Sequence, residues 1–209
     1  LGPGEVADCI ENVGFGFMFA PQHHAAMKHV VPVRKALGVR TIFNLLGPLT
    51  NPANAPHQVI GVSDGPFLEH MAMALARLGG RSALVVSSED GLDEISISAP
   101  TRVVELRDGK VETYTVTPED LGVERAPIDA IGYGNPDDNA RITRAVLSGS
   151  DKGPALSLTL ANAGAAVYAA GRAETLRAGV EVAAEAVESG AANDLMERFV
   201  SRTQELAAA

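Results

Sequence analysis

The segment from 58 to 86 most constrains the fold, because it places a helix between two short apolar runs. The runs 58–62 and 82–86 show little polar alternation, and apolar residues recur on one side of a helix over 65–78. Strand, helix and strand of this kind are typical of a βαβ unit in a parallel sheet that is covered on both faces. The pattern predicts an α/β fold.

The remainder of the C-terminal part continues this class. Two alternating runs, 102–106 and 111–115, flank Asp108-Gly109, which is a hairpin signal. Four helices follow in series, and the last three are alanine-rich with charged outer faces that suit packing against a sheet. They are predicted over 136–147, 154–170, 174–188 and 193–206.

The first fifty residues have a different pattern. Helical spacing predicts short helices over 3–13, 23–31 and 33–37, and the turn-rich segment 44–52 is predicted as a rigid loop. We therefore predict part of a small helical domain with a hinge loop over residues 1–54. Residues 55–209 are predicted to form the α/β domain, with a largely parallel sheet flanked by helices.

Composition and charge exclude several classes of protein. The 209 residues carry a net charge of −9, which makes non-specific binding to nucleic acid unfavourable. The single cysteine excludes an intramolecular disulfide framework and a cysteine-rich zinc site. No apolar run approaches the roughly 20 residues that span a bilayer, and no basic-then-apolar leader begins the sequence. We predict a cytoplasmic protein without a membrane contact.

Acidic residues are absent from the window 12–63, although the chain contains 26 of them. This window has a formal charge of +4, which leaves −13 for the rest of the chain. A local positive field in an acidic protein attracts small anions to one place, so the window predicts an anion site. The alternative is a chance cluster on a solvated helix face. The four cations are Lys28, Arg34, Lys35 and Arg40.

A carboxylate-rich loop follows the predicted strand 82–86. Glu89, Asp90, Asp93 and Glu94 fall within six residues, and ligands of open α/β sheets bind beyond the carboxyl ends of strands. Neighbouring carboxylates repel one another unless they share a cation, and oxygen ligands in a loop suit Mg²⁺. If Asp93 and Glu94 serve one ion, the backbone must turn between them. The alternative is an acidic loop that is merely solvated.

An anionic substrate that also needs Mg²⁺ would use both features, and phosphorylated sugars have this chemistry. Five motifs then resemble, in order, the anthranilate phosphoribosyltransferase family of tryptophan biosynthesis. They run over nearly the whole chain and are Gly14–Pro21 (GFGFMFAP), His24–Lys28 (HAAMK), Val33–Gly38 (VRKALG), Arg40–Pro52 (RTIFNLLGPLTNP) and Asp90–Glu94 (DGLDE).

The resemblance implies the nucleoside phosphorylase/phosphoribosyltransferase type of fold with an N-terminal helical domain, and a homodimer. It also implies a reaction in which phosphoribose passes from phosphoribosyl pyrophosphate to the amine of anthranilate, with loss of pyrophosphate. The substrate amine is the nucleophile, so no residue of the chain is assigned as a covalent catalyst. The partners implied are these two substrates.

The resemblance also assigns binding residues. Arg34 matches the arginine that contacts anthranilate, and a guanidinium suits a planar carboxylate because it offers two parallel donors. His24 and Met27 match positions that line the entry channel of the aromatic acid, and Gly47 with Pro48 matches the turn that walls its ring.

Asp93 and Glu94 match the family's metal-binding carboxylates, so Mg²⁺ is the implied cofactor. Stabilising the charge of the leaving pyrophosphate is then the main catalytic contribution, and positioning of the substrates comes second.

Two family segments have no counterpart in this sequence: the Gly-Thr-Gly-Gly-Asp loop that cradles pyrophosphate and a Lys-His-Gly-Asn-Arg segment that closes over both substrates. The chain therefore looks like the C-terminal part of such an enzyme, with the first strands of its α/β domain missing, and we expect the isolated chain to be inactive.

Three alternatives remain open. The first is a paralogue of the same fold that binds nucleic acid. The net charge of −9 and the presence of Arg34 argue against it. The second is a pyrimidine nucleoside phosphorylase, against which the motif 40–52 counts. The third is a scaffold without activity.

Overall fold

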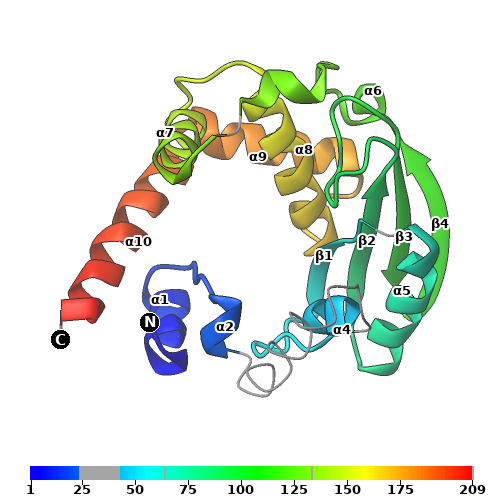
Figure 1. The fold of residues 1–209 in the computed structure, drawn as a ribbon, viewed down its shortest axis with the longest axis horizontal. Helices are drawn as coiled ribbons and strands as arrows, with labels where there is room; N and C mark the ends of the chain where they lie inside the picture. The colour runs from blue at the N-terminus through cyan, green and yellow to red at the C-terminus, as the bar shows by residue number, and fades with distance from the viewer. Residues whose placement is uncertain (24–42, 64, 133, 209) are drawn as a thin grey trace.

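The computed structural model describes residues 1–23, 43–63, 65–132 and 134–208. Within them, a single sheet carries the α/β part of the chain, with strand order β1-β2-β3-β4. The strands are β1 (His57–Gly61), β2 (Ser82–Ser88), β3 (Thr101–Arg107) and β4 (Lys110–Val116). The predicted α/β class is confirmed (Figure 1).

The pairing of the strands is mixed. β1 and β2 are parallel, with His57 opposite Ser82 and Gly61 opposite Val86, as the strand–helix–strand pattern predicted. β2 pairs antiparallel with β3, and β3 pairs antiparallel with β4 in the predicted hairpin. The expectation of a largely parallel sheet is therefore corrected for the described strands, because β3 follows β2 through a loop that lets it return antiparallel.

Helices cover both faces of the sheet (Figure 1). On one face the short 3₁₀ turn η2 (Gly65–Phe67) leads into α5 (Leu68–Arg77), whose Leu68, Met71 and Leu75 pack on β1, β2 and β3. The predicted single helix over 65–78 thus divides, since Pro66 lies in the tight first turn. α8 (Pro154–Ala169) and α9 (Leu176–Glu188) cover the opposite face.

α8 and α9 approach each other very closely. A Cβ placed on Gly179 would lie 2.2 Å from the Gly164 carbonyl oxygen, and one on Gly164 would lie 2.5 Å from the Val180 nitrogen. The two glycines therefore set the depth to which this helix pair packs over the sheet.

Two short helical turns and one longer helix connect the sheet to α8. α6 (Pro118–Leu121), a 3₁₀ turn η3 (Ile128–Ile131) and α7 (Pro136–Leu147) lead from β4 to α8. The four predicted C-terminal helices are confirmed as α7, α8, α9 and α10 (Ala191–Ala208), with ends that differ by a few residues.

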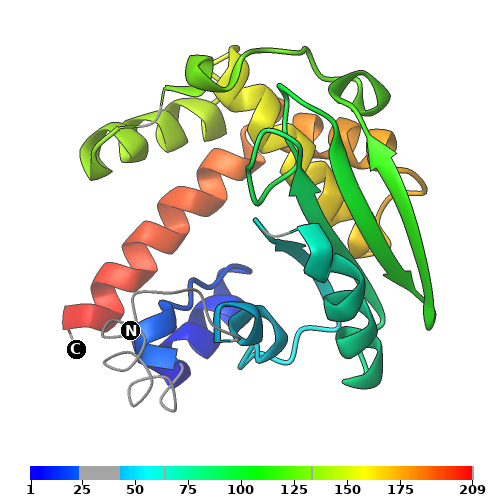
Figure 2. The ribbon, with the colours of Figure 1, turned by 45° about the vertical axis from the view of Figure 1, so that its right-hand side comes forward.

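α10 leaves the sheet and runs back to the start of the chain (Figure 2). It packs against α1 (Pro3–Asn12), where both oxygens of Asp8 accept hydrogen bonds from Arg202 at 2.7 and 2.8 Å. The rings of Phe15 and Phe199 meet edge to face, 4.8 Å apart. The domain boundary between residues 54 and 55 remains a prediction. α10 contacts elements on both sides of it, since it packs against α1 and against α7 and α9.

The segment 44–52 differs from its prediction. Instead of a loop, residues Phe43–Leu49 form helix α4, which contains Pro48. The helix is only 7 residues long, and the Thr50 hydroxyl donates to the carbonyl of Leu46 at 2.9 Å, so its last turn is satisfied despite the proline. Helix α2 (Ala20–His23) precedes it, and the predicted helices over 23–31 and 33–37 lie outside the described residues, apart from His23 at the end of α2.

No helix among the described residues is long and apolar enough to cross a membrane.

Candidate functional site

The candidate site lies at the carboxyl ends of β1 and β2, where a parallel pair opens toward its connecting loops. β2 ends at Ser88, and an irregular loop of residues 89–100 leads to β3. This loop contains all four carboxylates of the predicted acidic cluster.

Asp93 and Glu94 occupy the exposed outer part of the loop. The backbone bends at both residues, so the turn that a shared ion would require is present. Among the described residues, neither side chain makes a hydrogen bond or an ion pair. Both carboxylates are therefore available to an external partner from this part of the structure.

Glu94 is affected by its surroundings and by the neighbouring Asp93 carboxylate. Partial desolvation raises the pKa of Glu94, and the neighbouring Asp93 carboxylate raises it further. Each contribution disfavours the charged form, and a bound cation would offset both because it favours the ionised carboxylate. The pair is therefore suited to holding a cation.

The donor set fits Mg²⁺ better than a metal that demands a complete protein cage. No group of three or more His, Cys, Asp or Glu side chains that could hold a metal occurs within the described ranges. Mg²⁺ commonly binds through one or two carboxylates together with waters and substrate phosphates. Asp93 and Glu94 would be the protein ligands of such an ion.

Asp90 has a different role from its neighbours in the cluster. Its carboxylate accepts hydrogen bonds from the hydroxyls of Ser88, Ser96 and Ser98, and the bond from Ser96 is 2.6 Å long. Desolvation opposes ionisation, but these three donors outweigh it and lower the pKa of Asp90. Asp90 thus organises the loop from within.

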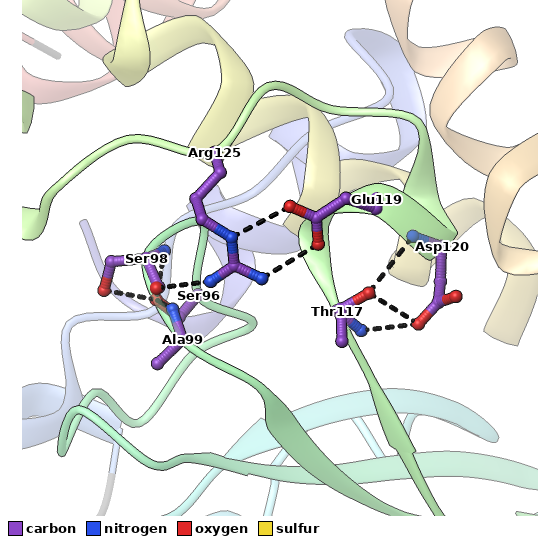
Figure 3. Close-up of polar contacts among 7 residues, drawn as sticks. All are labelled: Ser96, Ser98, Ala99, Thr117, Glu119, Asp120 and Arg125. Atoms are coloured by element: carbon purple, nitrogen blue, oxygen red, sulfur yellow. Dashed lines mark hydrogen bonds and ion pairs between the residues drawn. The ribbon is translucent and has the colours of Figure 1, made fainter.

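A second contact fastens the far side of this loop (Figure 3). Arg125 donates to the Ser98 carbonyl at 2.6 Å and forms two bonds of 2.8 Å with the Glu119 carboxylate at α6. The same helix begins with a capping box in which the Thr117 hydroxyl and backbone N–H both bond Asp120. Arg125 therefore connects the loop to a stable helix start.

Gly61 joins the acidic loop to the end of β1. A Cβ on this residue would lie 1.5 Å from the Asp93 carbonyl oxygen and 3.2 Å from the Asp93 Cβ. Only glycine permits this approach of two backbones.

Gly47 and Pro48 belong to α4. They line an open cleft of about 350 Å³ between α4 and β1. Gly61 also lines the cleft, so the cleft adjoins the Asp93 backbone at this glycine. The described residues that line it are Met18, Gly47, Pro48, Asn51, Pro52, Gln58, Val59, Ile60 and Gly61.

The remaining predicted binding residues, His24, Met27 and Arg34, lie outside the described residues. The four cations of the acid-free window lie there as well, so the predicted anion site stays a prediction. The assignment of Gly47, Pro48, Asp93 and Glu94 to substrate and metal likewise stays a prediction, to which the structure adds their positions.

Sequence reasoning missed two residues that shape the loop, Gly61 and Asn162. Gly61 ends β1 and stands between the apolar residues Ile60 and Val62 in the sequence, and a glycine at such a position is a signal of close backbone approach. Asn162 is the one amide side chain in the apolar helix α8, and a polar residue in such a helix needs a partner. Its partner, the backbone of Ile95, is 67 residues away in the sequence.

Comparisons with known proteins agree with the resemblance. The chain is 54% identical over 208 residues to anthranilate phosphoribosyltransferase of Symbiobacterium thermophilum. The alignment covers 100% of this chain and 61% of the relative. The chain is 53% identical over 203 residues to the anthranilate phosphoribosyltransferase of Thioalkalivibrio sulfidiphilus, and this alignment covers 97% of this chain and 60% of the relative. The chain thus spans about 60% of the length of these relatives.

Solved structures give the same result. Anthranilate phosphoribosyltransferase from Thermus thermophilus superposes with a TM-score of 0.89 at 46% identity, over 97% of this chain and 60% of that one. The Saccharomyces cerevisiae enzyme in complex with PRPP and Mg has a TM-score of 0.89 at 28% identity, over 98% of this chain and 59% of that one.

A family model described as "Glycosyl transferase family, a/b domain" matches residues 1–193. This match covers most of the chain, and the relatives named above favour the transferase interpretation over a nucleic-acid-binding paralogue or a nucleoside phosphorylase. The chain therefore belongs to the glycosyl transferase family that this α/β domain defines.

Proposed function

We propose that the protein containing this chain transfers phosphoribose from phosphoribosyl pyrophosphate to anthranilate, which forms phosphoribosyl-anthranilate and pyrophosphate. The observation that carries the proposal is the 54% identity to an anthranilate phosphoribosyltransferase over the entire chain. The carboxylate pair, which has no partner among the described residues and lies beside the cleft of Gly47 and Pro48, supports it.

Within this proposal the chain supplies two binding functions. Arg34 holds the carboxylate of anthranilate, with His24 and Met27 along its entry path. Gly47 and Pro48 present an apolar wall to the aromatic ring, and the cleft that they line leads toward Gly61. The substrate amine is thereby directed to the sugar carbon without a covalent intermediate on the protein.

Asp93 and Glu94 hold Mg²⁺ in this proposal. A yeast relative of 28% identity is described in complex with PRPP and Mg. When bound, the ion supplies positive charge to the departing pyrophosphate. The two carboxylates contribute by fixing the place of that charge beyond the sheet, at the end of β2.

The proposal includes a homodimer in the cytoplasm. Large apolar side chains are exposed around α1 and α2, which supports coverage of the helical part by a second copy: Ile10, Phe15, Phe17 and Phe19. Light scattering of the intact protein tests this, and a monomer at micromolar concentration contradicts it.

The decisive experiment measures turnover of the intact protein by the loss of anthranilate fluorescence with the phosphoribosyl donor and Mg²⁺. We expect Arg34→Ala to raise the KM for anthranilate far more than the KM for the donor. Arg77→Ala, at an exposed position on α5, is the matched control and should leave both constants unchanged. Equal effects of Arg34→Ala on both constants contradict its assignment.

The 209-residue chain tested alone should show negligible turnover. Binding of oligonucleotides instead of anthranilate would favour the paralogue, and appreciable turnover would contradict the expectation that the missing family segments are required.

A further inference from the structure

The loop that carries Asp93 and Glu94 has no ladder of strand hydrogen bonds, so its buried peptide groups need other partners. Ile95 follows Glu94 directly and is completely buried, as is Ile97. The side chain of Ile95 belongs to the core cluster beneath α8 and α9. The backbone of Ile95 is the point at which the acidic loop enters the protein interior.

A single side chain satisfies both peptide groups of Ile95. The Ile95 N–H donates to Oδ1 of Asn162 at 2.9 Å, and Nδ2 of Asn162 donates to the Ile95 carbonyl at 2.9 Å. Nδ2 also donates to the Leu158 carbonyl of its own helix at 3.0 Å. This third bond sets the orientation of the amide, so Asn162 presents one donor and one acceptor to the loop as a neighbouring strand would.

The carboxylate pair therefore lies between two anchors. On one side the Asp93 carbonyl rests against Gly61 of β1, and on the other side Ile95 is bound by Asn162 of α8. The backbone is held immediately before and after Glu94, while the two acidic side chains remain exposed. Residues behind metal ligands commonly fix their orientation in this way.

We propose that Asn162 is a positioning residue, which holds Asp93 and Glu94 in the arrangement that binds the divalent cation. This inference rests on the proposed function, because it takes the two carboxylates as the cation's protein ligands. Asn162 acts through the backbone of Ile95 and has no contact with substrate.

The test measures cation affinity directly in the intact protein. Mn²⁺ replaces Mg²⁺ as the probe, since carboxylates bind both ions, and the electron paramagnetic resonance signal of free Mn²⁺ is titrated in the presence of inorganic pyrophosphate. The double variant Asp93→Asn/Glu94→Gln identifies the signal that belongs to this site. Wild-type protein that binds no Mn²⁺, or a double variant that binds it equally well, contradicts the proposed metal site and with it the role of Asn162.

Asn162→Ala should weaken Mn²⁺ binding by about 10-fold or more, the usual effect of losing a residue that orients a ligand. Asn135→Ala is the matched control: Asn135 caps α7 by accepting from the Asp137 and Asp138 N–H groups at 2.9 and 3.0 Å, away from the acidic loop. It should lower thermal stability and leave Mn²⁺ affinity unchanged. If Asn162→Ala lowers only the stability, as the control does, Asn162 merely fastens the loop and the proposal is wrong, while the metal site stands.

Asn162→Asp keeps the proposal testable if the alanine variant does not fold. Aspartate retains the acceptor for the Ile95 N–H, loses the donor to the Ile95 carbonyl and adds a negative charge near the site. That charge alone favours Mn²⁺ binding, so weaker binding supports a positioning role. Equal or tighter binding overturns it.

Discussion

Carboxylates toward the two ends of the same sheet have opposite environments. Asp93 and Glu94, beyond the carboxyl end of β2, are exposed and have no partner among the described residues. Glu105 in β3 is 8% exposed and accepts hydrogen bonds from the hydroxyls of Tyr114 and Tyr168, at 2.7 and 2.9 Å.

Arg107 completes the environment of Glu105. Its Nε lies 2.8 Å from Glu105 Oε1, and its guanidinium stands over the Tyr168 ring at 4.1 Å from the centroid. Desolvation and the Glu105 carboxylate raise the pKa of Tyr114 well above its usual range, so the phenol remains a donor. A cavity of about 300 Å³ lies beside this cluster and is lined by Glu105, Arg107 and Tyr168 together with Asp108, Lys110 and Glu112.

Internal hydrogen bonds therefore distinguish a carboxylate that stabilises the fold from one that is available to bind a ligand. A buried acid with internal donors contributes to the fold, and removing it leaves those donors unsatisfied. An exposed pair without internal donors contributes little to stability and is free to bind a cation.

Replacing Glu105 should have the largest effect on stability. Glu105→Ala leaves two phenols and part of Arg107 without an acceptor, which should cost about 3 kcal/mol in the free energy of unfolding. Asp93→Asn/Glu94→Gln should change that free energy by less than about 0.5 kcal/mol, as is usual for exposed positions. Urea unfolding of both variants checks this, and similar losses would remove the distinction between the two groups.

Gly61→Ala should come second and should affect the site as well as the fold. The added methyl would collide with the Asp93 carbonyl, and overpacking of this kind costs about 2 kcal/mol. The displaced loop should also lose Mn²⁺ affinity. Gly65→Ala is the control, since a Cβ there meets nothing within 4 Å; unchanged Mn²⁺ binding by Gly61→Ala would show that the loop tolerates displacement.

Ser96→Ala should have a smaller effect that separates Asp90 from its acidic neighbours. Loss of one of three hydroxyl donors should cost about 1 kcal/mol and raise the pKa of Asp90 toward its ordinary value. Because the folded pKa of Asp90 is lowered, its contribution is present above the unfolded pKa and is lost as the pH falls through the folded one. Side-chain NMR titration measures the shift, and an unchanged Asp90 pKa would mean that Ser88 and Ser98 suffice.

Replacing Glu119 should have the smallest effect on the free energy of unfolding. Glu119 is exposed yet paired with Arg125, so it tests whether an ion pair stabilises the fold at an exposed position. Hydrogen bonds from Arg125 lower the pKa of Glu119 from 4.5 to about 2. The contribution of the pair should be complete above the unfolded pKa and should fade as the pH falls toward the folded one. The difference in urea stability between wild type and Glu119→Gln should therefore shrink between pH values of about 5 and about 2; a constant difference would contradict this.

The fold was largely predictable because its signals are local. Short runs with little polar alternation indicated β1 and β2, Asp108-Gly109 indicated the β3–β4 hairpin, and helical spacing indicated α7 to α10. The prediction for the segment 44–52 is wrong, since Gly47-Pro48 indicates a turn locally, whereas the segment packs against α5 as a helix. The site was predictable only as a set of residue types, and Asp90 was grouped with Asp93 and Glu94 although its hydrogen bonds separate it from them.

The sequence by itself determined the α/β class, the carboxylate loop at a strand end and the family, because periodicity and motifs depend on neighbours along the chain. Tertiary structure alone decided which acids are satisfied and which are available, and that Gly61 and Asn162 hold the loop from β1 and α8. The physical reason is that hydrogen bonds and close approaches between residues far apart in the chain exist only after the sheet and helices have packed.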